Sequence, residues 1–339
     1  MRFTKLFAAV LCSLAALAAS GQNLRDEIAA NPGKSGGVYY VYTYDNPVLT
    51  PAPKGYKPFY ISHYGRHGSR WLLHDSEYDE VMAVFRAADA ANAFTERGRE
   101  VYGRVKRVYD DGIDRGGDLS PLGAEQHREI AARMYRNFPE VFRSGAVVDA
   151  QATLVVRCVL SMAAFCERLK GLNPRLEVSR TAGRRTTRYL NFYSKPTNPT
   201  LSREYLDFID KGGWQEEYER IGDRFVRPGR LMSELFADGE FVRTIDAQKL
   251  MKGLFYFAAD MQNVGLGISF YDLFTTDELY GLNVYDNYKY YVIRGPSPLN
   301  RRFPQYYAKA LLEDFLTRAD RAVEGGAVSA DLRFGHDGN

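Results

Sequence analysis

Apolar and polar positions along the chain recur with two different periods. Residues 58–63 alternate, with Phe59 and Ile61 apolar beside Tyr60 and Ser62, and this period of two predicts a β-strand. The following segments have the period of amphipathic helices, about 3.6 residues. These predicted helices span 75–92, 95–110 and 121–137.

A second strand followed by a helix is predicted at 152–171, with β-branched and apolar residues over 153–156 and a helix over 160–169. Residues 173–200 are polar and irregular, whereas 201–282 carry helical patterns without a strand signal. Later elements are predicted as a strand at 288–293, a helix at 305–323 and a last strand at 330–334.

Strands that alternate with helices, interrupted by a helical stretch, predict an α/β fold. We expect a core with a central mixed sheet flanked by helices, formed by residues 21–172 and 286–339. Residues 173–285 are expected to form an inserted, mainly helical cap. Only five residues follow the last predicted strand, which suggests that further C-terminal core elements are absent from this sequence and leaves the activity of this form open.

The N-terminus has the pattern of a secretory signal. Arg2 and Lys5 precede an apolar run over 6–19 that ends in small residues before Gly21. The run is shorter than the roughly 20 residues that span a bilayer. We therefore predict a signal peptide at 1–20 and an exported protein, periplasmic or secreted, without a membrane anchor once the signal is removed.

Composition and charge exclude few classes of function. The 339 residues are 45% hydrophobic and 26% charged, as in an ordinary globular protein. Because the predicted signal holds two basic residues and no acid, its removal lowers the formal net charge from +3 to about +1. Such a balance predicts no nucleic-acid partner.

The two cysteines outside the signal are not expected to pair. If the chain from Cys158 to Cys166 is helical, they lie roughly 12 Å apart, beyond the reach of a disulfide. We expect buried thiols, and two cysteines alone form no metal site. The acidic residues over 110–118 have no calcium-loop register, so a turn-rich loop is expected there.

The strongest chemical signal follows the first predicted strand, where residues 66–70 read RHGSR. Loops after strands are common ligand sites in α/β folds. Arginine binds a phosphoryl group with two parallel hydrogen bonds. Like-charge repulsion from Arg66 and Arg70 favours the neutral ring of His67, and a neutral imidazole can act as a nucleophile.

This loop resembles the Arg-His-Gly-x-Arg-x-Pro signature of the histidine acid phosphatases, which include phytases and multiple inositol polyphosphate phosphatases. Leu72 stands where that signature has proline, so one φ constraint on the loop is missing. The resemblance covers most of residues 36–339. Three further segments match in the same order: LSPLGAEQ at 119–126, VRCVLSMAAF at 156–165 and LRFGHD at 332–337.

The resemblance implies hydrolysis of phosphomonoesters through a phosphohistidine on His67, without a metal or other cofactor. Asp337 would protonate the leaving oxygen as general acid. Fixed charges and hydrogen-bond donors would stabilise the transition state. The phosphate-binding residues that the resemblance implies are Arg66, Arg70, Arg157 and His336.

The substrate signals are mixed. An aspartate directly after His336 is typical of phytases and general acid phosphatases, whereas the segment around Arg157 resembles more closely the inositol polyphosphate group. A basic stretch interleaved with aromatic residues could contact a polyphosphorylated substrate or be a solvated loop face. Its candidate substrate-binding residues are Arg184, Arg185, Arg188 and Lys195. We expect phytate or another inositol phosphate as substrate.

Two other functions remain open. A general acid phosphatase or a sugar-phosphate phosphatase would use the same scaffold. An inactive periplasmic binding protein for phosphorylated ligands would bind tightly without turnover. Of the remaining histidines, His127 is expected on a helix surface, and His63 in strand packing or in support of the site.

Overall fold

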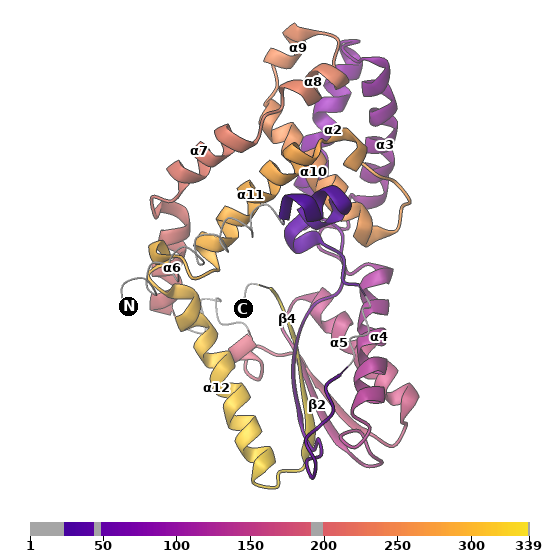
Figure 1. Ribbon diagram of the computed structural model, residues 1–339, viewed down its shortest axis with the longest axis vertical. Coiled ribbons are helices and arrows are strands. Elements are labelled where there is room, and N and C mark those ends of the chain that lie inside the picture. Colours follow the sequence, from indigo (N-terminus) through magenta and orange to yellow (C-terminus); the bar gives the residue numbers. More distant parts are fainter. Residues whose placement is uncertain (1–23, 44–48, 191–198, 338–339) are drawn as a thin grey trace, which may run out of the picture.

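The computed structural model describes residues 24–43, 49–190 and 199–337. The predicted signal at 1–20 lies outside these residues. The chain folds into a sheet layer below and a helical unit above (Figure 1). In chain order the elements are η1 (Pro32–Tyr39), β1 (Ile61–Arg66), α2 (Asp75–Ala90), α3 (Glu96–Gly112), α4 (Pro121–Asn137), β2 (Val147–Ala152), α5 (Val156–Leu172), β3 (Glu177–Thr181), η2 (Arg188–Leu190), α6 (Pro199–Lys211), α7 (Gln215–Phe225), α8 (Gly229–Leu235), α9 (Gly239–Arg243), α10 (Ala247–Val264), η3 (Tyr271–Leu273), α11 (Thr276–Ile293), η4 (Pro298–Asn300), α12 (Phe303–Val323) and β4 (Val328–Gly335).

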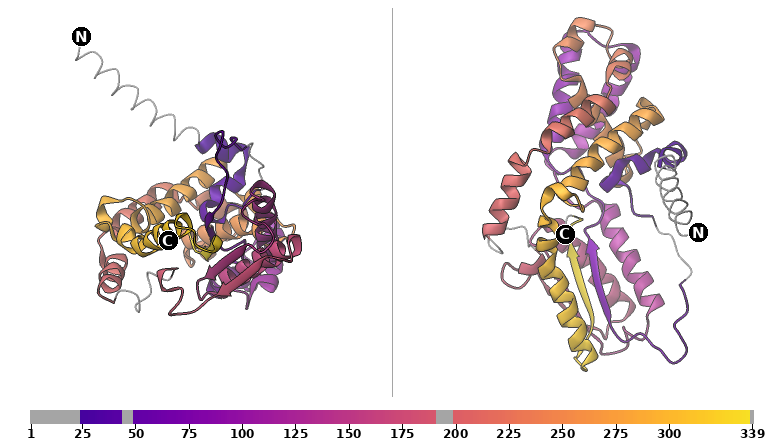
Figure 2. Two further views of the ribbon diagram at one scale, coloured as in Figure 1. Left: turned by 90° about the horizontal axis from the view of Figure 1, so that it is seen from below. Right: turned by 60° about the vertical axis from the view of Figure 1, so that its left-hand side comes forward.

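The four strands form one sheet in the order β1-β4-β2-β3, and every neighbouring pair is parallel. The predicted α/β core with a helical unit is confirmed, but the described sheet is parallel rather than mixed. All four carboxyl ends therefore lie at one edge, which points toward the helical unit (Figures 1 and 2). Helices α4 and α5 cover one face of the sheet and α12 covers the other.

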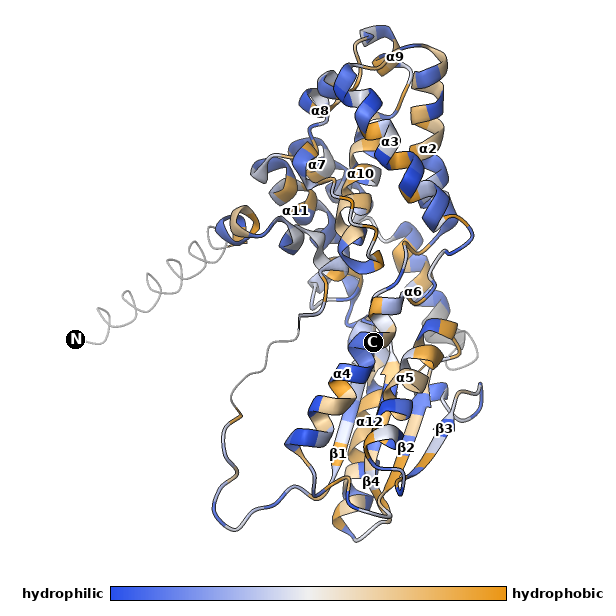
Figure 3. Cartoon of the chain, turned by 90° about the vertical axis from the view of Figure 1, so that its right-hand side faces the viewer, coloured by the Kyte–Doolittle hydropathy of each residue, from blue (hydrophilic) through white to orange (hydrophobic). Residues whose placement is uncertain are grey.

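The two faces of β4 differ in chemistry because successive side chains alternate across a strand. Ala330, Leu332 and Phe334 are fully buried in the apolar cluster under α4 and α5. Figure 3 shows the hydrophobic colouring of this layer along the strands and α5. On the other face, Asp331 and Arg333 are buried beneath α12.

Ion pairs hold α12 against this polar face. Arg333 is 1% exposed, and its Nε donates to Asp314 of α12 at 2.7 Å. One turn along α12, Arg318 donates to Asp149 at 2.6 Å and to Asp331 at 2.5 Å. Because buried charges are tolerated only when they are paired, α12 can pack on this face of the sheet only with these ion pairs formed.

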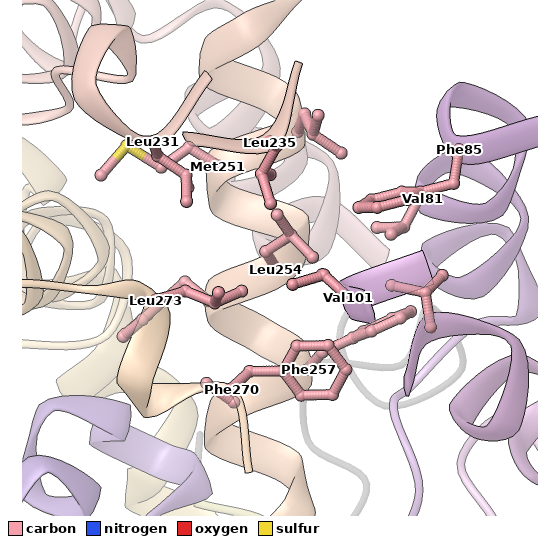
Figure 4. Packing of buried hydrophobic residues seen from close by; sticks show 14 of the residues in the cluster. Val81, Phe85, Val101, Leu231, Leu235, Met251, Leu254, Phe257, Phe270 and Leu273 are labelled. Atoms are coloured by element: carbon pink, nitrogen blue, oxygen red, sulfur yellow. The ribbon is translucent and has the colours of Figure 1, made fainter. Parts of the chain in front are cut away.

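The helical unit has its own apolar core, formed mainly by α2, α3, α8 and α10. Phe85 and Val101 of the first two helices face Leu254 and Phe257 of α10 (Figure 4). The expected cap at 173–285 therefore differs from the structure in two ways. Helices α2 and α3 pack with this unit, and β3, which begins at Glu177, belongs to the sheet.

Two predicted strands are wrong. The run 153–156 connects the strand to α5, which begins at Val156. The strand lies earlier, at 147–152, where alanines at two of its buried positions weaken the sequence signal. Residues 288–293 end α11, because a capping box at Thr275 starts this helix and no proline follows before Pro296. The expected buried thiols of Cys158 and Cys166 are confirmed.

Removal of Asp314 tests the charged face of the sheet. Asp314→Ala leaves the Arg333 guanidinium buried with one partner fewer, so the free energy of unfolding should fall by about 3 kcal/mol. Denaturant titration measures this loss. Glu313→Ala is the matched control, since Glu313 pairs with Lys309 in solvent and should cost less than about 1 kcal/mol. Equal losses would contradict the account.

Candidate active site

Strand pairing brings the two histidine loops together. Arg66 at the end of β1 pairs with Gly335 at the end of β4, and the N–H of His67 donates to the Gly335 carbonyl at 3.0 Å. The next residue of β4's loop is His336. Its ring lies 5.6 Å from that of His67 in an edge-on arrangement. Two segments far apart in the sequence thus form one site at the carboxyl edge of the sheet.

The start of α4 holds the loop after His67. A Cβ added to Gly68 would lie 2.2 Å from the Gly123 carbonyl oxygen, so only glycine permits this approach. Gln126 accepts from the Ser69 N–H at 2.8 Å and donates to the Ser69 hydroxyl at 2.9 Å. The Gly-x-x-Gln segment therefore supports the loop.

The ring of His67 is 6% exposed and neutral. Burial, reinforced by the charges of Arg66, Arg157 and Arg70, lowers its pKa to about 2. Its Nδ1 lies 2.8 Å from the Gly68 carbonyl oxygen. Because a carbonyl only accepts, Nδ1 carries the proton and Nε2 keeps a lone pair. The geometry thus provides a neutral ring with a lone pair in a cationic surrounding.

Each of the three arginines has a contact that places it near His67. Arg66 donates through Nη1 to the Val38 carbonyl at 2.6 Å. Arg70 is 9% exposed and donates to the Trp71 carbonyl at 2.7 Å. Arg157, in the first turn of α5, has Nη1 3.4 Å from the Gly117 carbonyl. Their charges converge from three different elements.

His336 and Asp337 complete the cluster. The Tyr64 hydroxyl donates to the His336 carbonyl at 2.9 Å and accepts from its N–H at 3.0 Å, which fixes the backbone. Thr153 Oγ1 lies 3.3 Å from Nε2 of the His336 ring. Burial and the charge of Arg157 lower the pKa of His336 to about 4. The Asp337 carboxylate lies 3.2 Å from Nε of Arg66.

The expectation that His127 lies on a helix surface is wrong. It is 2% exposed, and its Nε2 lies 3.1 Å from the Arg66 carbonyl oxygen. Its ring packs 5.5 Å from Phe334. This face of α4 covers the sheet, so His127 can form a hydrogen bond to the carbonyl at the end of β1. Sequence periodicity could not show this bond, because its partner belongs to another element. His63 packs against Phe165 and Phe334, as expected.

The basic stretch follows β3, the strand farthest from β1 in the sheet. Arg184, Arg185 and Arg188 follow β3 and are exposed. Since β3 is three strand positions from β1, the spacing of about 4.8 Å per strand separates the two by roughly 14 Å. Among the described residues, none of the three contacts the His67 cluster. Lys195 lies outside the described residues.

Two cavities adjoin the cluster. One of about 870 Å³ is lined by His67, Arg70 and residues of the segment from Val38 to Thr43. The other, of about 500 Å³, lies between Asp337 and α11. Sequence reasoning missed the second cavity, because 288–293 was interpreted as a strand. Its side chains from α11 and the residue after it are Asn283, Asp286, Asn287, Tyr290, Tyr291 and Arg294.

The charges of this second cavity reach the histidine cluster. The pKa of Tyr290 is raised to about 12, chiefly because the phenol is buried and further because of the negative charges of Asp286 and Asp337. The Arg294 charge contributes to the lowered pKa of His336. In the ranges that the structure describes, no three His, Cys, Asp or Glu side chains gather as a metal site, and no helix has the length and apolar character needed to cross a bilayer.

No protein-family model matches the chain, and no curated protein matches its sequence. Solved structures match its fold. A multiple inositol polyphosphate phosphatase from Bifidobacterium longum, in complex with inositol hexasulfate, is 19% identical with a TM-score of 0.75, over 88% of this chain and 78% of that one. Its apo form gives 20% identity and a TM-score of 0.72, over 88% and 77%.

A more distant match is the phytase of D. castellii, 14% identical with a TM-score of 0.59, over 90% of this chain and 65% of that one. At these identities the likeness establishes the fold. It agrees with the fold that the sequence motifs imply.

The protonation of His67 can be measured directly. In protein labelled with ¹⁵N-histidine, we expect its ring to stay neutral at pH 4, protonated on Nδ1, whereas free histidine is charged there. Long-range ¹H–¹⁵N spectra report both properties, and His67→Gln assigns the signals. A charged ring at pH 5, or a proton on Nε2, would contradict the derived geometry.

Proposed function

We propose that this chain is a histidine acid phosphatase that hydrolyses phosphomonoesters through a phosphohistidine formed on His67. The observation that carries the proposal is the neutral His67 ring, with its Nε2 lone pair, surrounded by Arg66, Arg70 and Arg157. A phosphate dianion is complementary to three guanidinium groups. A neutral imidazole among them is the nucleophile that such a dianion needs.

The reaction has two steps. In the first, His67 Nε2 attacks phosphorus, the bond to the ester oxygen breaks, and Asp337 gives its proton to that oxygen. In the second, water attacks the phosphohistidine and gives a proton to Asp337, which releases inorganic phosphate and restores His67. Arginine charges and the His336 ring stabilise the phosphoryl oxygens in both transition states.

A bound phosphate would also change the partner of Arg66. In the structure this guanidinium pairs with Asp337 at 3.2 Å. The phosphate would compete with Asp337 for Arg66, because both are anions that bind the same donors. The carboxyl group would then be available for proton transfer at the ester oxygen.

We propose a polyphosphorylated inositol such as phytate as the substrate. Since Asp337 protonates the leaving oxygen, the alcohol part belongs in the cavity beside it. That cavity offers the amide of Asn287 to a hydroxyl group and Arg294 to a further phosphate. The B. longum protein of the same fold was solved with inositol hexasulfate, which is consistent with this choice.

We also propose export to the periplasm or the medium, from the signal pattern at 1–20. Mature protein recovered from the cell envelope or medium should begin near Gly21, as N-terminal mass spectrometry would report. A protein retained in the cytoplasm with Met1 intact would contradict export without affecting the chemistry.

Replacement of the two reacting residues should have different effects. His67→Ala should lower kcat on phytate and on an aryl phosphate at least ~10⁴-fold, because the nucleophile is lost. Asp337→Asn should lower kcat on phytate about 10²–10⁴-fold but affect the aryl ester far less, since a phenolate leaves without protonation. Steady-state kinetics at acidic pH measure both. Activity retained in His67→Ala would exclude the mechanism.

Substitution of Arg294 tests the substrate. Arg294→Gln should lower kcat/KM for phytate about 10–100-fold, the value of one or two charged hydrogen bonds, with a change below about twofold for the aryl ester. Arg220→Gln removes the same charge from an exposed position on α7 and serves as control. Equal losses on both esters would favour a general acid phosphatase or a sugar-phosphate phosphatase.

A further inference from the structure

One buried carboxylate has no role in the chemistry above. Asp260 of α10 is 0% exposed, and among residues 24–43, 49–190 and 199–337 no group lies within hydrogen-bond geometry of either of its oxygens. The N–H of Leu72 points toward this carboxylate and favours its ionised form, but its hydrogen bond at 2.9 Å goes to the Tyr78 hydroxyl. An ionisable group buried without hydrogen bonds destabilises a fold, so its presence requires another explanation.

The position of Asp260 on α10 places it behind the phosphate loop. One turn further along the same face, Asn263 accepts from the Ser69 hydroxyl at 2.7 Å and donates to the Tyr39 carbonyl at 2.9 Å. Side chains three residues apart on a helix are neighbours. Asp260 therefore lies beside the residues that flank Arg70, on the side of the helical unit.

Arg70 is the cation whose charge acts on Asp260. Its guanidinium lies over the Tyr39 ring at 5.0 Å, and its buried Nε has no hydrogen-bond partner in the described part of the chain. The charge of Arg70 acts on Asp260, and that of Asp260 acts on Arg70. The same guanidinium faces the His67 site, where its charge lowers the pKa of His67. Arg70 thus lies between a buried acid and the phosphate site.

We propose that Asp260 is a positioning residue for Arg70, and that its carboxylate competes with a bound phosphate for the Arg70 guanidinium. Protonation of Asp260 and phosphate binding then favour each other, by the reciprocity of linked equilibria. The inference rests on the proposed function only in taking the arginine cluster as the phosphate site.

The direction of the pH effect follows from the groups around the carboxyl. Burial raises the pKa of Asp260 to about 8, Arg70 opposes this shift, and Glu77 adds to it. The phenols of Tyr39 and Tyr78 also face it and stay neutral in this range, because burial raises their pKa values. As pH rises through about 8, Asp260 gains its charge, holds Arg70 more strongly, and phosphate affinity should fall.

Inorganic phosphate is the probe, and isothermal titration calorimetry measures its Kd between pH 5.5 and 9. Asp260→Asn keeps the shape of the side chain and removes the charge. The ratio of wild-type Kd to Asp260→Asn Kd cancels the ionisation of phosphate itself. We expect this ratio to be near one at pH 5.5 and to reach about fivefold or more at pH 9, a typical coupling between linked sites.

The background of Arg70→Gln makes the test specific. There, Asp260→Asn should leave Kd unchanged at every pH, because the shared group is gone. A ratio constant with pH, or the same ratio in the Arg70→Gln background, would overturn the inference. Circular dichroism melts establish that each variant is folded.

The outcomes separate this inference from the proposed function. Wild-type protein that binds phosphate with the expected pH dependence but cleaves no ester would contradict the phosphatase assignment and support the role of Asp260. Ester hydrolysis together with a Kd ratio that does not change with pH would support the phosphatase assignment and contradict the role of Asp260. A wild-type protein that binds no phosphate would overturn both.

Discussion

Parallel pairing of β1 with β4 is the constraint on which the site depends. The register that aligns Arg66 with Gly335 continues into the loops through the hydrogen bond from the His67 N–H to the Gly335 carbonyl. Because both strands run in the same direction, their loops leave the sheet at one edge. A shift of one residue would turn the two histidines to opposite faces. The chemistry therefore rests on main-chain geometry.

The second requirement is electrostatic. Three arginines near one small ring repel each other and are costly to bury. The structure distributes the cost over several elements: η1 offers the Val38 carbonyl to Arg66, and Trp71 offers its own carbonyl to Arg70. The same crowding keeps His67 neutral. The positive surrounding that disfavours a charge on the His67 ring also attracts a phosphate dianion. The same arginines therefore keep the ring neutral and favour phosphate binding.

The sequence was sufficient to predict the elements that local patterns determine. Helices α2, α3 and α4, strand β4 and the loop 66–70 could be found from periodicity, caps and motif order. The parts that it missed depend on packing. Alanines made β2 weak as a strand, a β-prone run at 288–293 continued α11, and the buried place of His127 needed a carbonyl from another element. Arg294 and Asp260 could be related to the site only through tertiary structure, because each belongs to the helical unit.

The most direct test of the account is to trap the covalent intermediate. A phosphomonoester labelled with ³²P is mixed with enzyme in a single turnover, quenched in alkali and digested. We predict a label that survives alkali and is lost in acid, as for phosphohistidine, on the peptide that contains His67 and on its Nε2. Full turnover without any labelled protein, or a label on another peptide, would contradict the central claim.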